Sequence, residues 1–402
     1  MLVFVHEFCC SGAFSGDVCG SSLAREGLAM LTAIVEDFSR RDGGPVRVAT
    51  TLDSRLRDSP SAARIAERAR VDWAESPDEE RNLFQKLAGA SQATLVIAPE
   101  SNGWLLERRQ MTDAAKGRFL GHSSEAIRLC GDKLSFHDHL RKHALPTIPT
   151  SLWSLSANLS EIAFPIVMKP RYGAGSVDTL FIRDPDDLKT RRAELIGCFA
   201  AESEAIVQPY LAGRALSVAA LIGSKSDRID IFPLAEQRIS HEGRLWYRGG
   251  RIPAADISPD LAREVGDVIR AACRSLPGLS GYIGFDLIST NAGPRVRIVE
   301  ANPRLTTSYI GYRCLTFDNL AARMLFPDAR RQPIAWNVRA EEVGWDKLAQ
   351  RAPVHPRRSG NVRPASANAA SSHSKNAALQ PLIQCVEFDA DGEVRLIASS
   401  ER

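Results

Sequence analysis

The sequence lacks paired cysteines and any strong excess of charge of one sign. None of its eight cysteines forms a Cys-x-x-Cys pair, and their spacing suits neither a zinc site nor a disulfide framework. Reduced thiols in a cytoplasmic protein are therefore the simplest interpretation. The 51 Lys and Arg residues nearly balance the 48 Asp and Glu residues, and the resulting net charge of +3 argues against a nucleic-acid partner.

Long apolar runs are also missing, because no stretch approaches the length that crosses a membrane. The apolar start at residues 2–5 is interrupted by His6 and Glu7 and has no basic residues before it. We therefore expect a buried strand there and neither a signal peptide nor a membrane anchor. The 402 residues are 44% hydrophobic and 25% charged, which is typical of a globular protein with two or three domains.

The amino-terminal third alternates between predicted strands and predicted helices. Apolar runs at residues 2–5, 46–50 and 93–98 predict buried strands, and the segments between them include helical patterns. Such alternation indicates a parallel, Rossmann-like sheet, whose functional loops follow the carboxyl ends of the strands. Glu7 and Glu100 lie at such ends. An alternative is that Glu100 only caps the turn that follows it.

Two segments in the last third predict a β-hairpin that brings acidic side chains together. Residues 282–290 and 295–300 are rich in β-branched and apolar residues, with turn residues between them. If the turn is centred on its glycine, Asp286 lies opposite Glu300, and alternation places Asn302 on the same face as Glu300. Opposed carboxylates destabilise a bare hairpin, whereas a hard cation such as Mg²⁺ would reverse that effect. The alternative is a solvated hairpin with scattered charges.

A lysine-bearing strand and a glycine loop are candidate phosphate contacts. Lys169 ends the predicted strand at residues 164–169. The loop that follows contains Gly173, Gly175 and Ser176. Backbone N–H groups of such a loop can bind phosphate, and the lysine adds a point charge. Arg304, which follows the hairpin, could bind an anion through its planar fork of N–H donors.

The order of these motifs resembles the ATP-grasp superfamily of carboxylate–amine ligases. A lysine strand, a glycine loop and a later Asp…Glu-x-Asn-Pro-Arg follow one another, and the resemblance covers residues 1–330. The run Asn-Pro-Arg-Leu-Thr-Thr-Ser-Tyr at 302–309 is most similar to the tyramine–glutamate ligase group of methanofuran biosynthesis. The amino-terminal strand and Ala-Pro-Glu at 98–100 are similar to that group too. The resemblance implies an α/β fold of α+β lobes, with an amino-terminal Rossmann-like pre-ATP-grasp domain.

We expect three parts in the chain. They are a pre-ATP-grasp domain at residues 1–122, a two-lobed ATP-grasp domain at 123–330 and a carboxyl-terminal extension at 331–402. Ser, Ala, Asn, Pro and Arg dominate residues 351–376, which predicts a disordered linker. The runs at 382–387 and 393–397 predict a terminal hairpin, to which the sequence assigns no role.

The resemblance also implies which residues bind the nucleotide and the substrates. Lys133 matches the first nucleotide-contacting lysine, and residues 205–211 resemble the hinge strand that reads the adenine. The implied nucleotide contacts are Lys133, Lys169, Gly173, Gly175, Ser176, Gln208 and Leu211. The implied metal ligands are Asp286, Glu300 and Asn302, the implied catalytic residues are Arg304 and Lys169, and the implied substrate contacts are Glu7, Gly12, Glu100, Thr306, Thr307 and Ser308. Pro209, Tyr210 and Ala215 stand where the superfamily often has other residues, so no ribose contact is assigned.

The implied reaction joins the γ-carboxylate of glutamate to tyramine or tyrosine through an acyl-phosphate, with release of ADP. The implied cofactors are ATP and a pair of Mg²⁺ ions, with Mn²⁺ as an alternative. Such phosphoryl transfer needs charge neutralisation and alignment more than acid–base groups. Two alternatives remain open: an amino-acid ligase with other substrates, such as a dipeptide ligase, and a non-catalytic nucleotide-binding regulatory protein. Small molecules are the expected partners, without nucleic acid or membrane, and a homodimer is the assembly that we consider.

Overall fold

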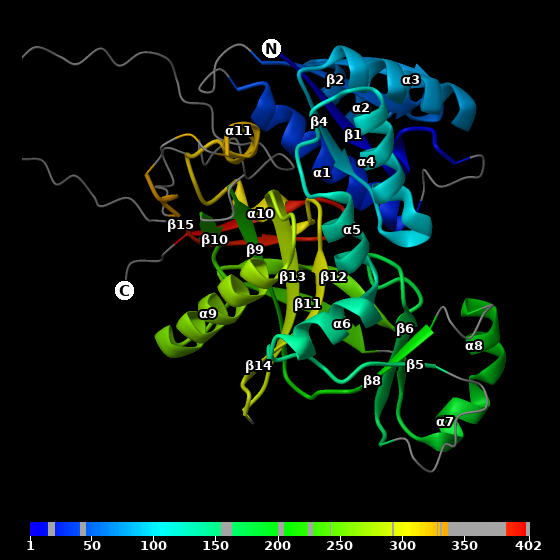
Figure 1. Ribbon diagram of the computed structural model, residues 1–402, viewed down its shortest axis with the longest axis vertical. Helices are drawn as coiled ribbons and strands as arrows, with labels where there is room; N and C mark the ends of the chain where they lie inside the picture. The colour runs from blue at the N-terminus through cyan, green and yellow to red at the C-terminus, as the bar shows by residue number, and fades with distance from the viewer. Residues whose placement is uncertain are drawn as a thin grey trace, which may run out of the picture.

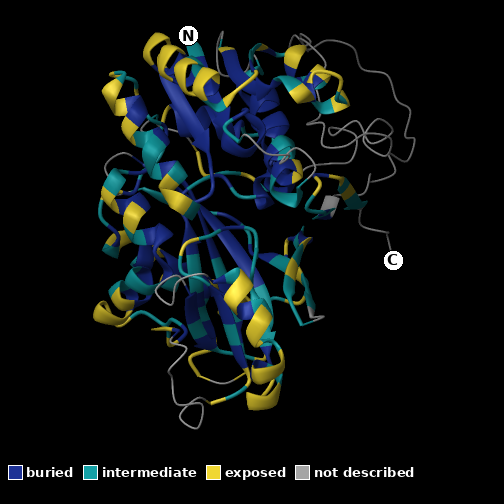
Figure 2. Cartoon of the chain, turned by 90° about the vertical axis from the view of Figure 1, so that its right-hand side faces the viewer, coloured by how far each residue is buried: buried dark blue, intermediate teal, exposed yellow. Residues whose placement is uncertain are grey.

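The computed structural model arranges the chain as three β-sheets with flanking helices (Figure 1). It describes residues 1–14, 21–40, 46–153, 163–199, 205–223, 228–241, 243–291, 293–327, 329, 332–336 and 383–398. The linker predicted at residues 351–376 lies outside the described residues. Figure 2 shows that the buried residues gather in the strands, whereas the exposed residues lie mainly on helices and loops.

The first sheet has the strand order β3-β2-β1-β4, and all its pairs are parallel. Its strands are β1 (Leu2–Glu7), β2 (Arg47–Asp53), β3 (Ala69–Ala74) and β4 (Ala93–Ile97). The predicted Rossmann-like sheet is thereby confirmed. The sequence patterns missed β3, because this strand lies at the edge of the sheet and is only partly buried, so it carries charged residues.

Four helices cover the two faces of this sheet. They are α1 (Ser22–Phe38), α2 (Pro60–Ala66), α3 (Pro77–Ala90) and α4 (Trp104–Ala114). Val3 and Val5 pack in one apolar cluster with α1 and α2, and Phe4 packs on the other face with α3 and α4. This division follows from the alternation of side chains along a buried strand. The Oγ of Ser21 accepts a hydrogen bond from Ala24 N and so fixes the start of α1.

The second sheet is antiparallel, with the order β14-β13-β9-β11-β12-β15-β16 and with β10 paired to β9. Its strands are β9 (Arg214–Ile222), β10 (Ile229–Ile231), β11 (Ala235–His241), β12 (Leu245–Ile252), β13 (Gly281–Ser289), β14 (Val296–Asn302), β15 (Ile383–Phe388) and β16 (Val394–Ala398). Helices α5 (Ser124–Gly131), α6 (Lys133–Lys142) and α9 (Pro259–Ser275) share one apolar cluster with this sheet. Helices α10 (Ser308–Tyr312) and α11 (Leu320–Leu325) belong to the cluster that also contains α1.

The third sheet is small and has the order β5-β8-β6-β7. Its strands are β5 (Ser151–Leu152), β6 (Ile166–Pro170), β7 (Leu180–Ile182) and β8 (Ala205–Pro209), and it packs with α7 (Pro185–Thr190) and α8 (Arg192–Cys198). Strand β6 carries Lys169, and β7 returns antiparallel after the glycine loop. The sheet therefore holds the glycine loop at its edge, beside the second sheet.

The predicted terminal hairpin is confirmed as β15 and β16, and the structure gives it a place that the sequence did not (red in Figure 1). Strand β15 pairs with β12, so the tail extends the second sheet. Val386 and Phe388 are buried, and Phe388 contacts Gly249 and Gly311. The hairpin therefore belongs to the core of the protein.

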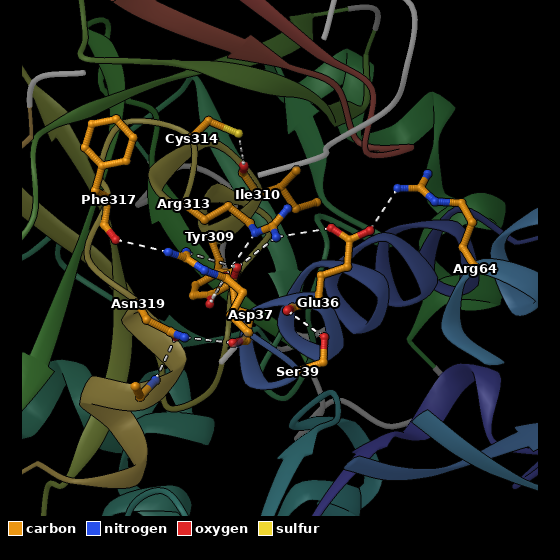
Figure 3. A network of polar contacts seen from close by, with 12 residues as sticks. Glu36, Asp37, Ser39, Arg64, Tyr309, Ile310, Arg313, Cys314, Phe317 and Asn319 are labelled. Carbon is orange, nitrogen blue, oxygen red and sulfur yellow. Dashed lines mark hydrogen bonds and ion pairs between the residues drawn. The ribbon is translucent and has the colours of Figure 1, made fainter. Parts of the chain in front are cut away.

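A buried network of charges joins α1 to the segment around α10 (Figure 3). Arg313 is fully buried and donates hydrogen bonds to Asp37 Oδ1 at 2.8 Å and to Glu36 Oε2 at 3.1 Å. Tyr309 Oη also donates to Asp37, at 2.6 Å. The network fixes the first sheet against the second through α1.

Two simple expectations concern the whole chain. Seven cysteines lie among the described residues and all are free thiols, whereas Cys19 lies outside them. None of the helices in the described part of the chain is long and apolar enough to cross a membrane.

Candidate active site

Two adjoining pockets lie against the second sheet and share one wall: the larger faces the third sheet, and the smaller faces the glycine loop and α1. The larger pocket encloses about 930 Å³ of free space and the smaller about 590 Å³, both open to solvent. The predicted residues that line the larger pocket are Lys133, Lys169, Gly173, Ser176, Gln208, Leu211, Asp286 and Glu300. Those that line the smaller pocket are Gly175, Ser176, Asp286, Glu300, Asn302, Arg304, Thr306, Thr307 and Ser308. Ser176, Gln237, Tyr247, Asp286 and Glu300 line both pockets and form the shared wall.

The register of the β13–β14 hairpin sets the acidic part of this wall. Asp286 pairs with Glu300, as the sequence predicted, and the next pair is Leu287 with Ile298. The shift leaves Val299 as an extra residue on β14, which is a bulge next to the two carboxylates. Because of it, the consecutive residues Val299 and Glu300 both line the larger pocket.

Asp286 is held in place by two side-chain amides. Gln237 Nε2 donates to its Oδ1 at 2.8 Å, and Asn302 Nδ2 donates to its Oδ2 at 3.3 Å. Gln237 lies on β11, so the β11–β12 ribbon fixes one oxygen and the hairpin fixes the other. The carboxylate is thereby oriented before any ligand binds.

Two lysines from different elements meet at Glu300. Lys169 Nζ on β6 lies 3.2 Å from Glu300 Oε2, and Lys133 Nζ at the start of α6 lies 3.8 Å from the same oxygen. Lys133 Nζ also donates to the carbonyl of Gly173 at 2.8 Å, which ties α6 to the glycine loop. The two predicted lysine contacts and the predicted metal ligands Asp286 and Glu300 are therefore brought together in the larger pocket, whereas Asn302 lines only the smaller one.

The pKa values of the two carboxyls shift in opposite directions, because the lysines act mainly on Glu300. Burial, together with the neighbouring carboxylate of Glu300, raises the pKa of Asp286 to about 7. Burial alone would also raise the pKa of Glu300, but the ammonium groups of Lys169 and Lys133 outweigh it and lower that pKa to about 2. The pair therefore carries less than its full negative charge until a further cation arrives.

Arg304 is positioned by Glu100, which follows β4 of the first sheet. Its Nε donates to Glu100 Oε1 at 3.1 Å, and both side chains are almost fully buried. The carboxylate of Glu100 makes no helix cap, so the capping alternative was wrong. The first sheet thus directs a guanidinium into the smaller pocket.

Hydroxyl groups surround the rest of the smaller pocket. Thr306 Oγ1 lies 2.9 Å from Tyr282 Oη, and Ser308 Oγ lies 3.4 Å from Ser217 Oγ. Thr307 Oγ1 donates to Glu26 Oε2 at 3.1 Å. These short polar side chains leave an open space that can accept a small polar molecule.

Glu7 and Gly12 do not line either pocket. The carboxylate of Glu7 is buried, accepts a hydrogen bond from Cys10 N at 2.7 Å and packs against Gly27 of α1. Burial raises the pKa of Glu7 to about 7. Gly12 has φ of +94°, and a Cβ there would lie 3.0 Å from Ala74 Cβ. Their predicted contact with substrate therefore stays a prediction that neither pocket supports.

Further residues also line the pockets. Segments 236–238 and 247–251 resemble the superfamily's mobile loop near the phosphates, and Gln237 and Tyr247 line both pockets, but they lie on the paired strands β11 and β12. Glu26 on α1 lines the smaller pocket as well. No local signal marks it, because its surroundings in the pocket come from β9, β12 and the segment after β14.

The donor set fits a hard divalent cation. The described residues contain no group of three or more His, Cys, Asp or Glu side chains arranged as a metal site. Asp286, Glu300 and Asn302 instead offer two carboxylates and one amide oxygen, and Mg²⁺ prefers oxygen ligands and keeps several positions for water or phosphate. Two buried carboxylates that face each other also favour a cation between them.

Comparisons with known proteins agree with this geometry. The model of the ATP-grasp domain matches residues 130–308, and the model of the pre-ATP-grasp 3 domain matches residues 46–127. The tyramine–L-glutamate ligase of Methanocaldococcus jannaschii is 26% identical over 256 residues, which cover 63% of this chain and 68% of that relative.

Solved structures show the same fold at lower identity. An ATP-grasp superfamily protein from Archaeoglobus fulgidus gives a TM-score of 0.61 at 22% identity, covering 88% of this chain and 96% of that one. The biotin carboxylase domain of 2-oxoglutarate carboxylase from Hydrogenobacter thermophilus, solved with MgADP and bicarbonate, gives 0.62 at 15% identity, covering 84% and 74%.

With the fold, the two pockets and both matching domains in place, the chain belongs to the ATP-grasp superfamily. Within it, the chain is an ATP-dependent carboxylate–amine ligase.

Proposed function

We propose that this chain joins the γ-carboxylate of glutamate to tyramine or tyrosine through an acyl-phosphate, in the biosynthesis of a methanofuran-type cofactor. The observation that carries the proposal is the shared wall between the two pockets. Asp286 and Glu300 face both, so a phosphate bound in the larger pocket lies next to a carboxylate bound in the smaller one. The M. jannaschii relative supports the choice of substrates.

In this proposal, ATP occupies the larger pocket. Apolar side chains such as Val167, Leu211 and Ile288 provide a wall for the adenine, and the lysines at the other end bind phosphate. Gly173, Gly175 and Ser176 form the loop over the phosphates and exclude water from them. We also propose the domain limits 1–122, 123–330 and 331–402 that the sequence predicted.

A pair of Mg²⁺ ions, or Mn²⁺ in their place, held by Asp286, Glu300 and Asn302 would neutralise the charge that develops on the transferred phosphoryl group. Lys133 and Lys169 bind oxygens of the same group as point charges. Arg304, held by Glu100, binds the acyl-phosphate as it forms. Thr306, Thr307 and Ser308 orient the amino acid through their hydroxyls.

Two bonds form and two bonds break in the proposed sequence. A γ-carboxylate oxygen of glutamate attacks the terminal phosphorus of ATP, and ADP leaves. The amine nitrogen then attacks the acyl carbon, phosphate leaves with the former carboxylate oxygen, and the nitrogen loses a proton. Water must be excluded throughout, because it would hydrolyse the acyl-phosphate.

The test is ADP release with glutamate against a panel of amines and amino acids, with the mass of each product recorded. We expect a γ-glutamyl amide of tyramine or tyrosine, and ¹⁸O from the γ-carboxylate should appear in phosphate. AMP and pyrophosphate would overturn the mechanism. A product with another acid, such as a dipeptide, would keep the mechanism and overturn the substrates. Nucleotide binding without any turnover would favour a regulatory protein. Sedimentation of the purified chain distinguishes a homodimer from a monomer.

A further inference from the structure

The smaller pocket has one acidic side chain that phosphoryl transfer does not explain. Glu26 lies on α1, far in the sequence from the hairpin and the glycine loop, and its side chain lines this pocket. It is only 8% exposed. Buried carboxylates in proteins are normally paired with a cation or with several donors, so such a residue needs a partner.

The protein itself supplies little of that partnership. Within the described structure, the carboxylate of Glu26 accepts one hydrogen bond, from Thr307 Oγ1 at 3.1 Å, and takes part in no ion pair. Burial raises the pKa of Glu26 to about 7, although Thr307 and Arg304 act in the other direction. By contrast, Glu36 on the same helix is paired with both Arg64 and Arg313.

The glycine loop packs closely against α1 beside Glu26. Gly175 has φ of +68°, and a Cβ there would lie 2.8 Å from Leu23 Cδ2 of α1. The glycine loop therefore contacts the same helix turn that carries Glu26. Arg304 lines the pocket as well, and its positive charge acts on the Glu26 carboxyl.

An anion and a cation in one small polar pocket match the two ends of an amino acid. We infer that Glu26 is an ammonium subsite, which binds the α-ammonium group of the amino acid whose side-chain carboxylate is activated, while the Arg304 side of the pocket receives its anionic groups. Thr307 is a positioning residue, because its hydroxyl fixes the carboxylate of Glu26. The inference rests on the proposed function and names the group by which its acid substrate is recognised.

A pair of substrates isolates this contact. Glutarate has both carboxylates of glutamate but no amino group, so it can be activated in the same way without an ammonium. The wild-type protein should prefer glutamate to glutarate in ADP release. Glu26→Gln keeps the size of the side chain and removes its charge, so it should reduce that preference by about 10- to 100-fold, through a higher KM for glutamate. Glutarate kinetics should change little, and Glu26→Asp should recover part of the preference.

Asp391→Asn is the matched control. It removes one negative charge that acts on Glu26, but Asp391 is exposed, pairs with Arg25 and does not line the pocket. It should keep the wild-type preference. If the role of Glu26 were purely structural, Glu26→Gln would lower the unfolding temperature of the protein and would change kcat equally with both acids.

The outcomes separate the inference from the proposed function. If Glu26→Gln slows ADP release equally with glutamate and with glutarate, the ammonium subsite is overturned and the proposed ligase activity still stands. No ADP release by the wild-type protein with glutamate and any amine would overturn the proposed function itself. A wild-type protein that treats glutamate and glutarate alike also contradicts the inference.

Discussion

Two buried clusters of charge, one around Arg313 and one around Glu300, differ in how completely their charges are matched. Arg313 lies between Asp37 and Glu36, and Tyr309 donates a further hydrogen bond to Asp37. Neither of the two pockets is lined by these residues. The charges and hydrogen bonds of this cluster therefore satisfy one another inside the protein.

The cluster at the shared wall is matched only in part. Glu300 faces Asp286 on one side and two lysines on the other, and open space borders all four groups. Among the described residues, both lysines pair with Glu300 and neither forms an ion pair with Asp286, and all four side chains line the larger pocket. A cluster whose charges are all paired within the protein holds two parts of the fold together. A cluster whose charges are only partly paired, and which borders a pocket, is suited to bind charged ligands.

Glu300→Ala should have the largest effect and tests whether the cluster around Glu300 serves catalysis. We expect ADP release to fall by about 10³-fold or more, because a metal ligand and a partner of both lysines are lost together. The free energy of unfolding should fall as well, because Lys133 and Lys169 are left buried without their carboxylate, although the loss of repulsion with Asp286 offsets part of that cost. Denaturant unfolding next to kinetics checks both statements. Near-normal turnover would show that Glu300 is not a metal ligand.

Lys169→Ala tests the same cluster around Glu300, and we expect a smaller effect on turnover. Lys169 approaches Glu300 and lines the larger pocket, so its removal should weaken nucleotide binding and cut turnover by about 10²-fold. Titration calorimetry with ADP and Mg²⁺ measures the first effect. Arg263→Ala, in an exposed pair with Asp260 on α9, is the control and should change neither.

Arg313→Met should show the opposite behaviour. The substitution leaves Asp37 and Glu36 buried without their cation, which costs about 3–5 kcal/mol of unfolding free energy. At temperatures where the variant is folded, we expect the KM for ATP to stay near that of the wild type. A variant as stable as the wild type would mean that the network contributes nothing to holding the first sheet against the second.

His122 provides a third buried group, one that the protein keeps neutral. Burial lowers the pKa of His122 to about 4, and both ring nitrogens are engaged, with Ser280 N at 3.1 Å and Tyr282 O at 2.9 Å. The unfolded chain takes up a proton near pH 6.5, whereas the folded chain does so only near pH 4. Stability is therefore present above pH 6.5 and falls as the pH drops toward 4, by about 3 kcal/mol in all.

Urea unfolding between pH 7 and pH 5 measures this effect, with His122→Gln as the comparison. Glu7 and Glu26 have raised pKa values and change stability in the opposite direction over part of this range. The difference between the two proteins is thus the quantity to read. Parallel curves for wild type and variant would contradict the assignment to His122.

The smallest expected effect concerns a region without buried charge. Val386 on β15 is fully buried and pairs with Ile252, so Val386→Ala should cost about 2 kcal/mol of unfolding free energy. Glu393→Ala in the exposed turn of the same hairpin is the control and should cost less than about 0.5 kcal/mol. Equal stability of the two variants would mean that the hairpin adds nothing to the core.

Short-range periodicity in the sequence was enough to predict several features of the fold. Alternation along two neighbouring strands placed Asp286 opposite Glu300, because a hairpin joins them through a short turn. The same reasoning gave the parallel sheet and the terminal hairpin. It could not give the bulge at Val299 or the split of the helical region after Asp184 into α7 and α8, because both depend on packing partners.

The set of distant side chains that share a pocket depends on how whole elements pack. Glu26 and Thr307 meet because α1 packs beside α10, and Arg304 is directed by Glu100 from the end of β4. The tail also joined β12 through a pairing that no local pattern specifies, since any strand edge with free backbone groups can accept a strand. Local patterns fix which face a side chain takes, and the packing of whole elements fixes what that face meets.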